Sequence, residues 1–157
     1  MSFKNILCFG TLNPDLIYFV DELPNKGDDI RSLKSSIRPG GTAINCSELI
    51  SLWDKSVHVR GNSIGSDPMG KYLVDYLKEN NINFDGLIIN QSLTPTCSIF
   101  VDSSGERTIV SSGYEGLEWS NFENLNNFDS LIIDRYSIKF IKDKLKDLKK
   151  QNNLFVC

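Results

Sequence analysis

The feature that most constrains the fold is the alternation of short apolar runs with apolar residues at helical spacing. Residues 6–12 are typical of a strand, and from Gly41 onward the apolar residues recur at steps of three and four, which predicts a helix packed on a sheet. The stripe consists of Ala43, Ile44, Cys46, Leu49, Ile50 and Trp53. A further strand at 57–61 and a helix beginning near Pro68 repeat the pattern. This alternation favours an α/β fold.

Strands without intervening helices are predicted elsewhere in the chain. A second early run covers 16–20, and three strand candidates follow one another over 86–90, 96–102 and 107–112. Residues 103–106, between the last two candidates, are typical of a hairpin turn. The three successive candidates predict a small sheet added to a larger α/β body.

The C-terminal part resumes the strand–helix pattern. A strand is predicted at 130–134, and 154–157 is apolar like an interior strand of a parallel sheet. Between them, an amphipathic helix has apolar residues at Ile138, Ile141, Leu145 and Leu148. A crossover helix and further strands would be expected after the last strand. We therefore expect one continuous unit with an unfinished C-terminal edge; a self-contained small α/β binding protein is the alternative.

Charge and composition argue against nucleic acid as a partner. The 157 residues carry 17 Lys and Arg against 20 Asp and Glu, a formal charge of −3, and 40% are hydrophobic, which fits a globular domain. Six lysines cluster at 139–150, but they lie opposite the apolar helical stripe, and Phe140 is the single aromatic residue among them. A solvated helix face is therefore favoured over nucleic-acid binding.

The cysteines and apolar runs indicate a reducing compartment. Cys8, Cys46, Cys97 and Cys157 form no C-x-x-C pair and show no zinc-ligand spacing with the single histidine. The sequence has no N-terminal signal pattern and no apolar run of about 18 residues. We expect a cytoplasmic protein without metal ligands and without membrane contact.

The segment Arg38-Pro-Gly-Gly-Thr-Ala-Ile-Asn45 places two glycines at the start of the first predicted helix. Glycines let a ligand approach the backbone, and unpaired N–H groups at a helix start can bind an anion or a hydroxyl oxygen. A tight turn into the helix explains the same pattern equally well.

Asn13 and Asp15 follow the first predicted strand, at the edge where ligands bind in open α/β sheets. Their amide and carboxylate suit a polyhydroxylated ligand, whereas a turn around Pro14 is the alternative. Asp134 ends a later predicted strand, where a substrate contact and an ion pair with Arg135 are both open.

Two other patterns are not interpreted as sites. Residues 65–72 nearly match the phosphate-binding pattern G-x-x-x-x-G-K-[ST], but Tyr72 replaces the small hydroxyl residue and Asp67 would repel a phosphate. His58 lies in a predicted strand with no nucleophile arrangement nearby, so a structural role is favoured.

In order along the chain, four segments resemble the ribokinase-like (pfkB) family of carbohydrate kinases. They are GTLNPD with the following DELPNKGDD, then PGGTAIN, then GNSIGSDPMGKYL, then TPTCSIFVDSSGERT. The resemblance implies sugar-binding roles for Asn13, Asp15, Gly40, Gly41, Asn45 and Asp134, with Asp15 binding hydroxyls. Cys46 and Ser47 depart from the small apolar residues usual after the family's asparagine.

Family members are considerably longer, and their second signature, an Asp-Thr…Gly-Ala-Gly-Asp stretch, does not occur here. The resemblance therefore implies the N-terminal half, 1–157, of a doubly wound ribokinase-like α/β sheet, with a small β lid over about 16–38 and 86–112. It implies the sugar-binding and lid half of an enzyme that transfers the γ-phosphoryl of ATP to a sugar hydroxyl. ATP, Mg²⁺ and the catalytic residues would belong to the missing half, so this chain alone is expected to be inactive.

The resemblance also implies a homodimer formed through the lid. Two alternatives remain open at this point: a non-catalytic sugar-binding or dimerisation module, and a truncated gene product.

Overall fold

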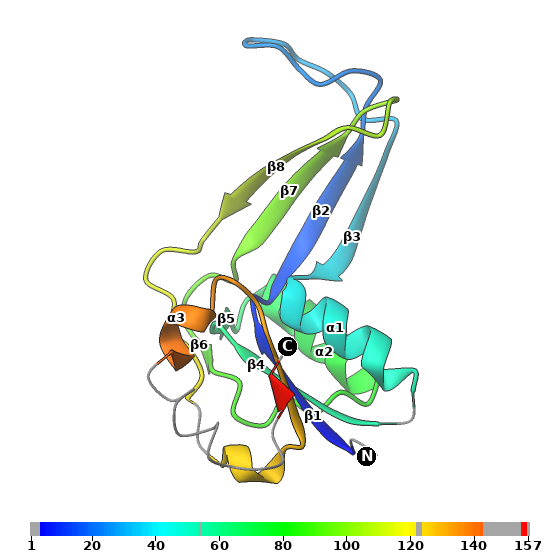
Figure 1. Cartoon of the computed structure of the whole chain (residues 1–157). Coiled ribbons are helices and arrows are strands. Elements are labelled where there is room, and N and C mark those ends of the chain that lie inside the picture. The colour runs from blue at the N-terminus through cyan, green and yellow to red at the C-terminus, as the bar shows by residue number, and fades with distance from the viewer. Residues whose placement is uncertain (1–3, 54, 122–123, 143–154, 157) are drawn as a thin grey trace.

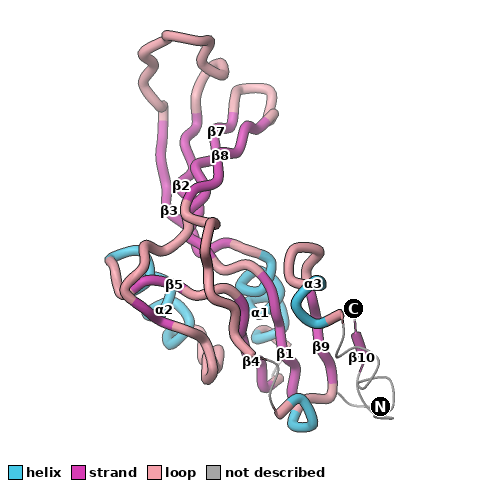
Figure 2. Tube along the Cα trace, turned by 90° about the vertical axis from the view of Figure 1, so that its left-hand side faces the viewer, coloured by secondary structure: helices cyan, strands magenta, loops and turns pink. Residues whose placement is uncertain are grey.

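The computed structural model describes residues 4–53, 55–121, 124–142 and 155–156. They form an α/β body from which a second sheet rises at one end (Figure 1). Seen from the side, the strands of this second sheet stand away from the body (Figure 2). The arrangement agrees with the predicted small sheet added to a larger α/β unit.

The body is built on a parallel sheet of four strands in the order β10-β9-β1-β4. The strands are β1 (Asn5–Gly10), β4 (Ser56–Gly61), β9 (Ser130–Ile133) and β10 (Phe155–Val156). Among the described residues β10 pairs only with β9, at the edge of this sheet. Strands were predicted at all four places, with ends that differ by a few residues.

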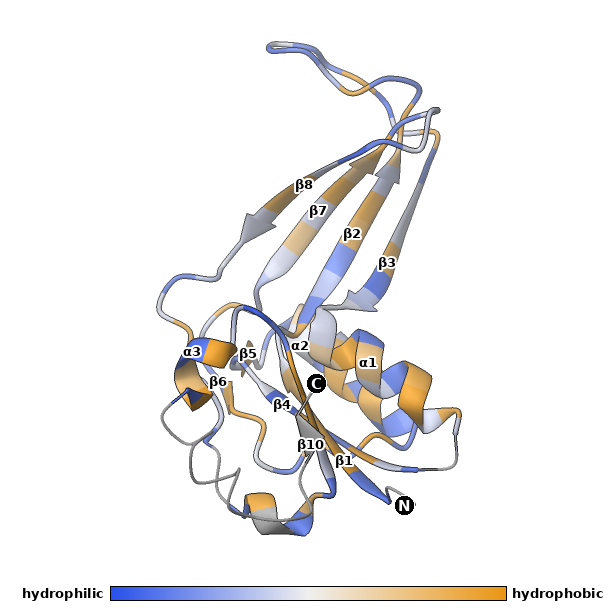
Figure 3. Ribbon diagram, viewed as in Figure 1, coloured by the Kyte–Doolittle hydropathy of each residue, from blue (hydrophilic) through white to orange (hydrophobic). Residues whose placement is uncertain are grey.

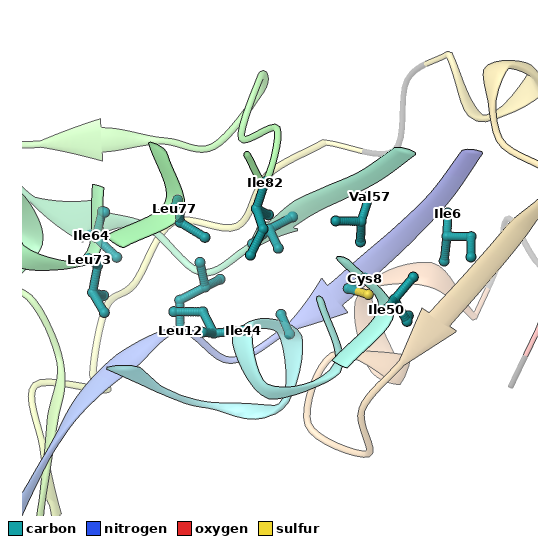
Figure 4. Close-up of a cluster of buried hydrophobic side chains, with 12 residues drawn as sticks. Ile6, Cys8, Leu12, Ile44, Ile50, Val57, Ile64, Leu73, Leu77 and Ile82 are labelled. Carbon is teal, nitrogen blue, oxygen red and sulfur yellow. The ribbon is translucent and has the colours of Figure 1, made fainter. Parts of the chain in front are cut away.

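Alternate residues of β1 point into two different cores, as expected for a strand covered on both faces. Ile6 and Cys8 belong to a cluster formed with α1 (Thr42–Ser51) and α2 (Pro68–Glu79) (Figure 4). Leu7 and Phe9 belong to a second cluster on the opposite face, with the 3-10 turn Leu125–Asn127 and α3 (Ile138–Ile141). The body sheet is therefore a central layer between two apolar layers.

The buried stripe of α1 is shorter than predicted. Ala43, Ile44 and Ile50 are buried as expected. Leu49 and Trp53, which the helical spacing assigned to the same stripe, are 61% and 68% exposed, because α1 ends at Ser51 and its outer face has no layer above it in the described structure. Apolar positions are visible along α1 toward its C-terminal end (Figure 3).

Helix α2 begins at Pro68, as predicted. Leu73 and Leu77 are fully buried, Asp67 caps its N-terminus by accepting a hydrogen bond from the N–H of Gly70 at 2.8 Å, and the chain leaves the helix at Asn80. The capping carboxylate satisfies one of the N–H groups that a helix start leaves unpaired.

The second sheet, called the lid sheet below, has the strand order β3-β2-β7-β8. Its strands are β2 (Asn13–Phe19), β3 (Lys34–Gly40), β7 (Thr96–Val101) and β8 (Arg107–Ser112). The central strands β2 and β7 run parallel, while β3 and β8 pair antiparallel on the outside. The predicted hairpin is confirmed as β7–β8, and β3 is a strand that the sequence analysis did not anticipate.

The strand predicted at 86–90 is reduced to β6 (Ile89–Asn90), which pairs with β5 (Ile64–Gly65) outside the lid sheet. The lysine-bearing helix is described only as α3, and Leu145 and Leu148 lie outside the described residues. Within the described residues, no helix has the length and apolar character needed to cross a bilayer.

Candidate functional site

A cavity of about 1110 Å³ lies where the body meets the lid sheet. Thr11, Asn13 and Asp15 line it from the start of the lid sheet, and Gly41, Thr42 and Asn45 from the start of α1. Its other walls come from the lid sheet, the segment that leaves it, and α3: Cys97, Ile99, Arg107, Ile109, Ser111, Ser112, Gly113, Tyr114, Glu115, Leu117, Trp119, Tyr136 and Lys139. The cavity thus opens beyond the carboxyl ends of the parallel strands, where ligands bind in open α/β sheets.

Asn13 and Asp15 lie together on β2 at this cavity. The Asn13 side chain is 2% exposed and donates from Nδ2 to Asp15 Oδ1 at 2.7 Å. Burial raises the pKa of Asp15 above its usual value, and the hydrogen bond from Asn13 offsets this only in part. The amide therefore fixes one carboxylate oxygen of a half-buried Asp15 that lines the cavity.

The two glycines allow β3 and α1 to approach this carboxylate. Gly40 pairs with Asn13 across β2 and β3, and a Cβ on Gly40 would overlap the Asp15 carboxyl group. Gly41 has φ +84°, and a Cβ there would collide with the carbonyl of Thr11. Gly40 therefore leaves room for Asp15, and Gly41 permits a backbone conformation and a close approach that larger residues resist.

The start of α1 is less open to a ligand than the sequence indicated. The N–H of Thr42 donates to Thr11 Oγ1, and the N–H of Ala43 donates to the Thr11 carbonyl, both at 3.2 Å. These two groups are therefore satisfied by the protein. Asn45, one turn further along, is exposed and lines the cavity, so its side-chain amide is the part of α1 best placed to meet a ligand.

Asp134 lies behind Thr11 and is not part of the cavity lining. Its Oδ2 accepts from the N–H and Oγ1 of Thr11 at 2.8 and 3.1 Å. Its Oδ1 accepts from the N–H of Tyr136 and from the N–H and Oγ of Ser137, at 3.0, 2.7 and 2.7 Å. With both oxygens engaged in this way, the geometry favours a structural role for Asp134 over sugar contact, although its neighbour Tyr136 does line the cavity.

Several lining residues of the lid sheet were not identified from the sequence. Cys97 on β7 is the register partner of Asp15, and Ser111 on β8 is the register partner of Cys97; both line the cavity. On the other side of Asp15 its partner is Arg38 on β3, which is not among the lining residues. These four residues therefore lie in one row across the sheet, on the face that carries Asp15. Only the pairing register brings them together, and no motif in the sequence marks it.

Tyr114 follows the end of β8 and also lines the cavity. Its hydroxyl lies 3.6 Å from Cys97 Sγ, and burial raises the pKa of Tyr114 above its usual value, with further increases from Cys97 and from Asp15. Tyr114 is therefore a neutral hydroxyl near the Asp15 carboxylate.

In the segment 65–72, which contains the start of α2, the N–H groups that could face an anion are bound by Asp67. The Asp67 carboxylate accepts from the N–H groups of Gly70 and Thr94, at 2.8 and 2.9 Å, in the place where a phosphate-binding loop would hold an anion. Among the described side chains, no group of three His, Cys, Asp or Glu is arranged to hold a metal ion. The described residues therefore do not fit a nucleotide or metal site in this segment.

His58 makes contacts that suit its predicted structural role. Its ring meets Phe128 edge-on at 5.0 Å between centroids, and it lies 3.3 Å from Ser56 Oγ. Burial lowers its pKa below the usual value, with a smaller lowering from Arg60. His58 is also absent from the cavity lining.

The chain is similar in sequence and in fold to known proteins. The sequence profile of the pfkB family of carbohydrate kinases matches residues 4–156. A ribokinase of Dictyostelium discoideum is 28% identical over 108 residues, 68% of this chain and 34% of the relative. A ketohexokinase of Mus musculus is 30% identical over 112 residues, 70% of this chain and 37% of the relative.

The solved structure of a ribokinase from Giardia lamblia superposes with a TM-score of 0.76 at 21% identity, covering 99% of this chain and 50% of that one. This likeness confirms the expected fold. The chain spans about a third of the length of the curated relatives that it matches and about half of this structure.

Proposed function

The chain belongs to the pfkB family of carbohydrate kinases, and on this premise we propose that it forms the sugar-binding and lid half of an ATP-dependent carbohydrate kinase. One observation carries the proposal. Two motifs that are separated in the sequence, Asn13 with Asp15 and Gly41 with Asn45, line a single cavity between the body and the lid sheet. Gly40 leaves space for Asp15 beside it.

The chemistry of the cavity suits a small sugar. The Asp15 carboxylate accepts hydrogen bonds from hydroxyl groups, and the Asn45 amide both donates and accepts them. Ile99 and Ile109 line the same cavity from the lid sheet and offer an apolar surface to the C–H face of a sugar ring. The names of the two curated relatives, ribokinase and ketohexokinase, support a pentose or a ketohexose as the substrate.

We place phosphoryl transfer outside these 157 residues. Such a reaction would need Mg²⁺ to offset the charge of the ATP phosphates, an aspartate base to activate the sugar hydroxyl, and backbone N–H groups to stabilise the developing charge. The sequence contains no Gly-Ala-Gly-Asp stretch, and in the segment 65–72 the place of an anion is taken by Asp67. The purified chain should therefore not phosphorylate ribose or fructose with ATP, and turnover that persists through purification would contradict this.

Calorimetry with ribose and fructose tests the sugar site directly. Loss of a hydrogen bond to a charged group costs about 1.5–3 kcal/mol and loss of a neutral one about 1 kcal/mol, so Asp15→Ala should weaken binding more than Asn45→Ala. Asp75→Ala, which removes an exposed carboxylate of α2, is the control and should leave binding unchanged. Equal affinity in all three variants would exclude the cavity as the sugar site.

The lid sheet also supports the proposed homodimer. Leu16, Tyr18 and Phe100 share the face that points away from the cavity residues Ile99 and Ile109, by the pairing register. The rings of Tyr18 and Phe100 stack at 5.4 Å between centroids.

Two further apolar residues on this face, Ile37 and Val110, are 49% and 55% exposed. An apolar face of this kind can be covered by a second copy. Light scattering should show a dimer that Val110→Lys converts to a monomer; a wild-type monomer would exclude the dimer.

A further inference from the structure

The two central strands of the lid sheet leave the body in the same way. Thr11 lies two residues before β2, and Thr94 lies two residues before β7. Both threonines are buried, with 9% and 5% of their surface exposed. Each is bound by a carboxylate that belongs to the body.

At the root of β2, the carboxylate is Asp134. It accepts from both the N–H and the Oγ1 of Thr11, at 2.8 and 3.1 Å. Thr11 Oγ1 in turn accepts from the N–H of Thr42, at the start of α1. Ser137 holds the other oxygen of Asp134 with its N–H and its hydroxyl, both at 2.7 Å, so the acceptor is itself fixed to the body.

Before β7, Asp67 binds Thr94 in a similar way, but with one carboxylate oxygen for each group. It accepts from the N–H and the Oγ1 of Thr94, at 2.9 and 2.6 Å. Thr94 Oγ1 accepts from the N–H of Gly65 at 2.9 Å, and Asp67 is held by the N–H of Gly70 at the start of α2. Hydrogen bonds that involve an ionised partner are shorter and stronger than neutral ones, and two of them to one residue fix its orientation.

The side chain of Asn62 binds the backbone of Leu12, the residue that follows Thr11. Its Oδ1 accepts from the N–H of Leu12 at 2.8 Å, and its Nδ2 donates to the carbonyl of Leu12 at 3.0 Å. Asn62 is fully buried at the end of β4. Beyond Thr11 and Thr94, β7 is half-buried and β8 is exposed throughout. Packing on the body therefore does little to orient the outer part of the lid sheet.

We propose that Thr11 with Asp134 and Thr94 with Asp67 form a pair of anchors that set the angle of the lid sheet on the body. Because Asp15 on β2 and Cys97 on β7 are register partners only a few residues beyond the anchors, the same residues act as positioning residues for the cavity. This second part rests on the proposed sugar site, while the first does not depend on it.

Distances between two spin labels measure the angle of the lid sheet without any ligand. An azide-bearing amino acid at Ser104, in the turn between β7 and β8, and another at Lys78, on α2, both exposed, can carry the labels and leave the cysteines intact. Thr11→Val and Thr94→Val remove each hydroxyl while keeping the shape of the side chain. We expect either variant to broaden or shift the distance distribution, and the double variant to do so more.

Serine variants separate anchoring from general loss of structure. Thr11→Ser and Thr94→Ser keep the hydroxyl and should restore the wild-type distribution, and Thr108→Val, on exposed β8, should leave it unchanged. If a valine variant does not fold, Asp67→Asn, which retains only one acceptor oxygen, tests the second anchor instead. Folded valine or asparagine variants that keep the wild-type distribution would overturn the proposal, as would serine variants that fail to restore it.

Sugar affinity in the unlabelled variants tests the positioning role. Loss of one hydrogen bond at an anchor should weaken binding about fivefold in the valine variants, with recovery in the serine variants. If the valine variants broaden the distance distribution but the wild type shows no detectable sugar binding, the proposed sugar site is refuted and the proposed anchors are still supported. Normal binding with a broadened distribution would refute the positioning role.

Discussion

Replacing Gly40 by alanine displaces the Asp15 carboxylate without touching Asp15 itself. The backbone of Gly40 does not have a positive φ, so alanine is compatible with its conformation. However, the new Cβ would lie within 2.6 Å of Asp15 Oδ1 and closer still to Oδ2. No real Cβ tolerates such contacts, and the side chain of Asp15 is the group that must move.

The expected magnitudes follow from this contact. Overpacking of this kind costs about 1–3 kcal/mol of stability. Loss of the hydrogen bonds that Asp15 would make to sugar hydroxyls costs roughly 1.5–3 kcal/mol of binding, or about 10- to 150-fold in affinity. Calorimetry measures the second quantity and urea unfolding the first.

A double-mutant cycle isolates the cause. The three nearest atoms to the new Cβ all belong to the Asp15 carboxyl group, so in an Asp15→Ala background Gly40→Ala should cost neither stability nor affinity. Independent, additive losses in the double variant would refute the account of Gly40 as the residue that leaves room for Asp15.

Three further predictions concern single groups. Burial raises the pKa of Asp15, so its ionised form destabilises the unliganded fold. Asp15→Asn should therefore raise the melting temperature at pH 7 and weaken sugar binding. Its gain in melting temperature over the wild type should become smaller as the pH falls toward 4. Burial alone would raise the pKa of Asp67, but hydrogen bonds from Thr94 and Gly70 outweigh burial and lower it. The ionised carboxylate therefore stabilises the fold, and this stability should be lost as the pH falls below about 3.9. Thermal melts of Asp67→Asn should lack this loss. Saturating sugar should slow alkylation of Cys97, which lines the cavity; mass spectrometry should show no such protection at Cys46, and equal rates with and without sugar would contradict the site.

The fold was predictable from the sequence wherever one face of an element is buried. β4 and α2 bury regularly spaced apolar positions, and their periodicity marks them. β1 is buried on both faces, and its continuous apolar run marks it instead. β3 is different because it lies at the edge of the lid sheet and buries only Gly40. Its sequence KSSIRPG therefore shows no alternation, and pairing with β2 alone makes it a strand.

Along α1, only some of the apolar residues that were predicted to be buried are buried. Periodicity assigns Leu49 and Trp53 to the stripe that contains Ile50, yet both are exposed in the described structure. Leu49 adjoins the buried Ile50 but lies at the margin of the stripe, and Trp53 lies beyond the last residue of α1. Helical spacing does not report how wide a face the neighbouring layer covers or where the helix ends.

The candidate site was predictable where its residues are adjacent in the sequence. Asn13 with Asp15, and Gly40 and Gly41 with Asn45, form two short motifs, and the structure brings both motifs to one cavity. Cys97 and Tyr114 join the site only through strand register, which short-range patterns do not encode. Asp134 was singled out for its place at a strand end, and there the structure shows a carboxylate bound to Thr11 instead.

The proposed sugar site lies between the body and the lid sheet. Titration of the isotope-labelled chain with ribose or fructose, followed by amide chemical shifts, tests it most directly. We expect shifts confined to 11–15, 40–45 and the cavity face of β7 and β8, and their loss in Asp15→Ala. Shifts that map instead to α2 or to the outer face of the lid sheet, or that persist unchanged in Asp15→Ala, would contradict the proposal.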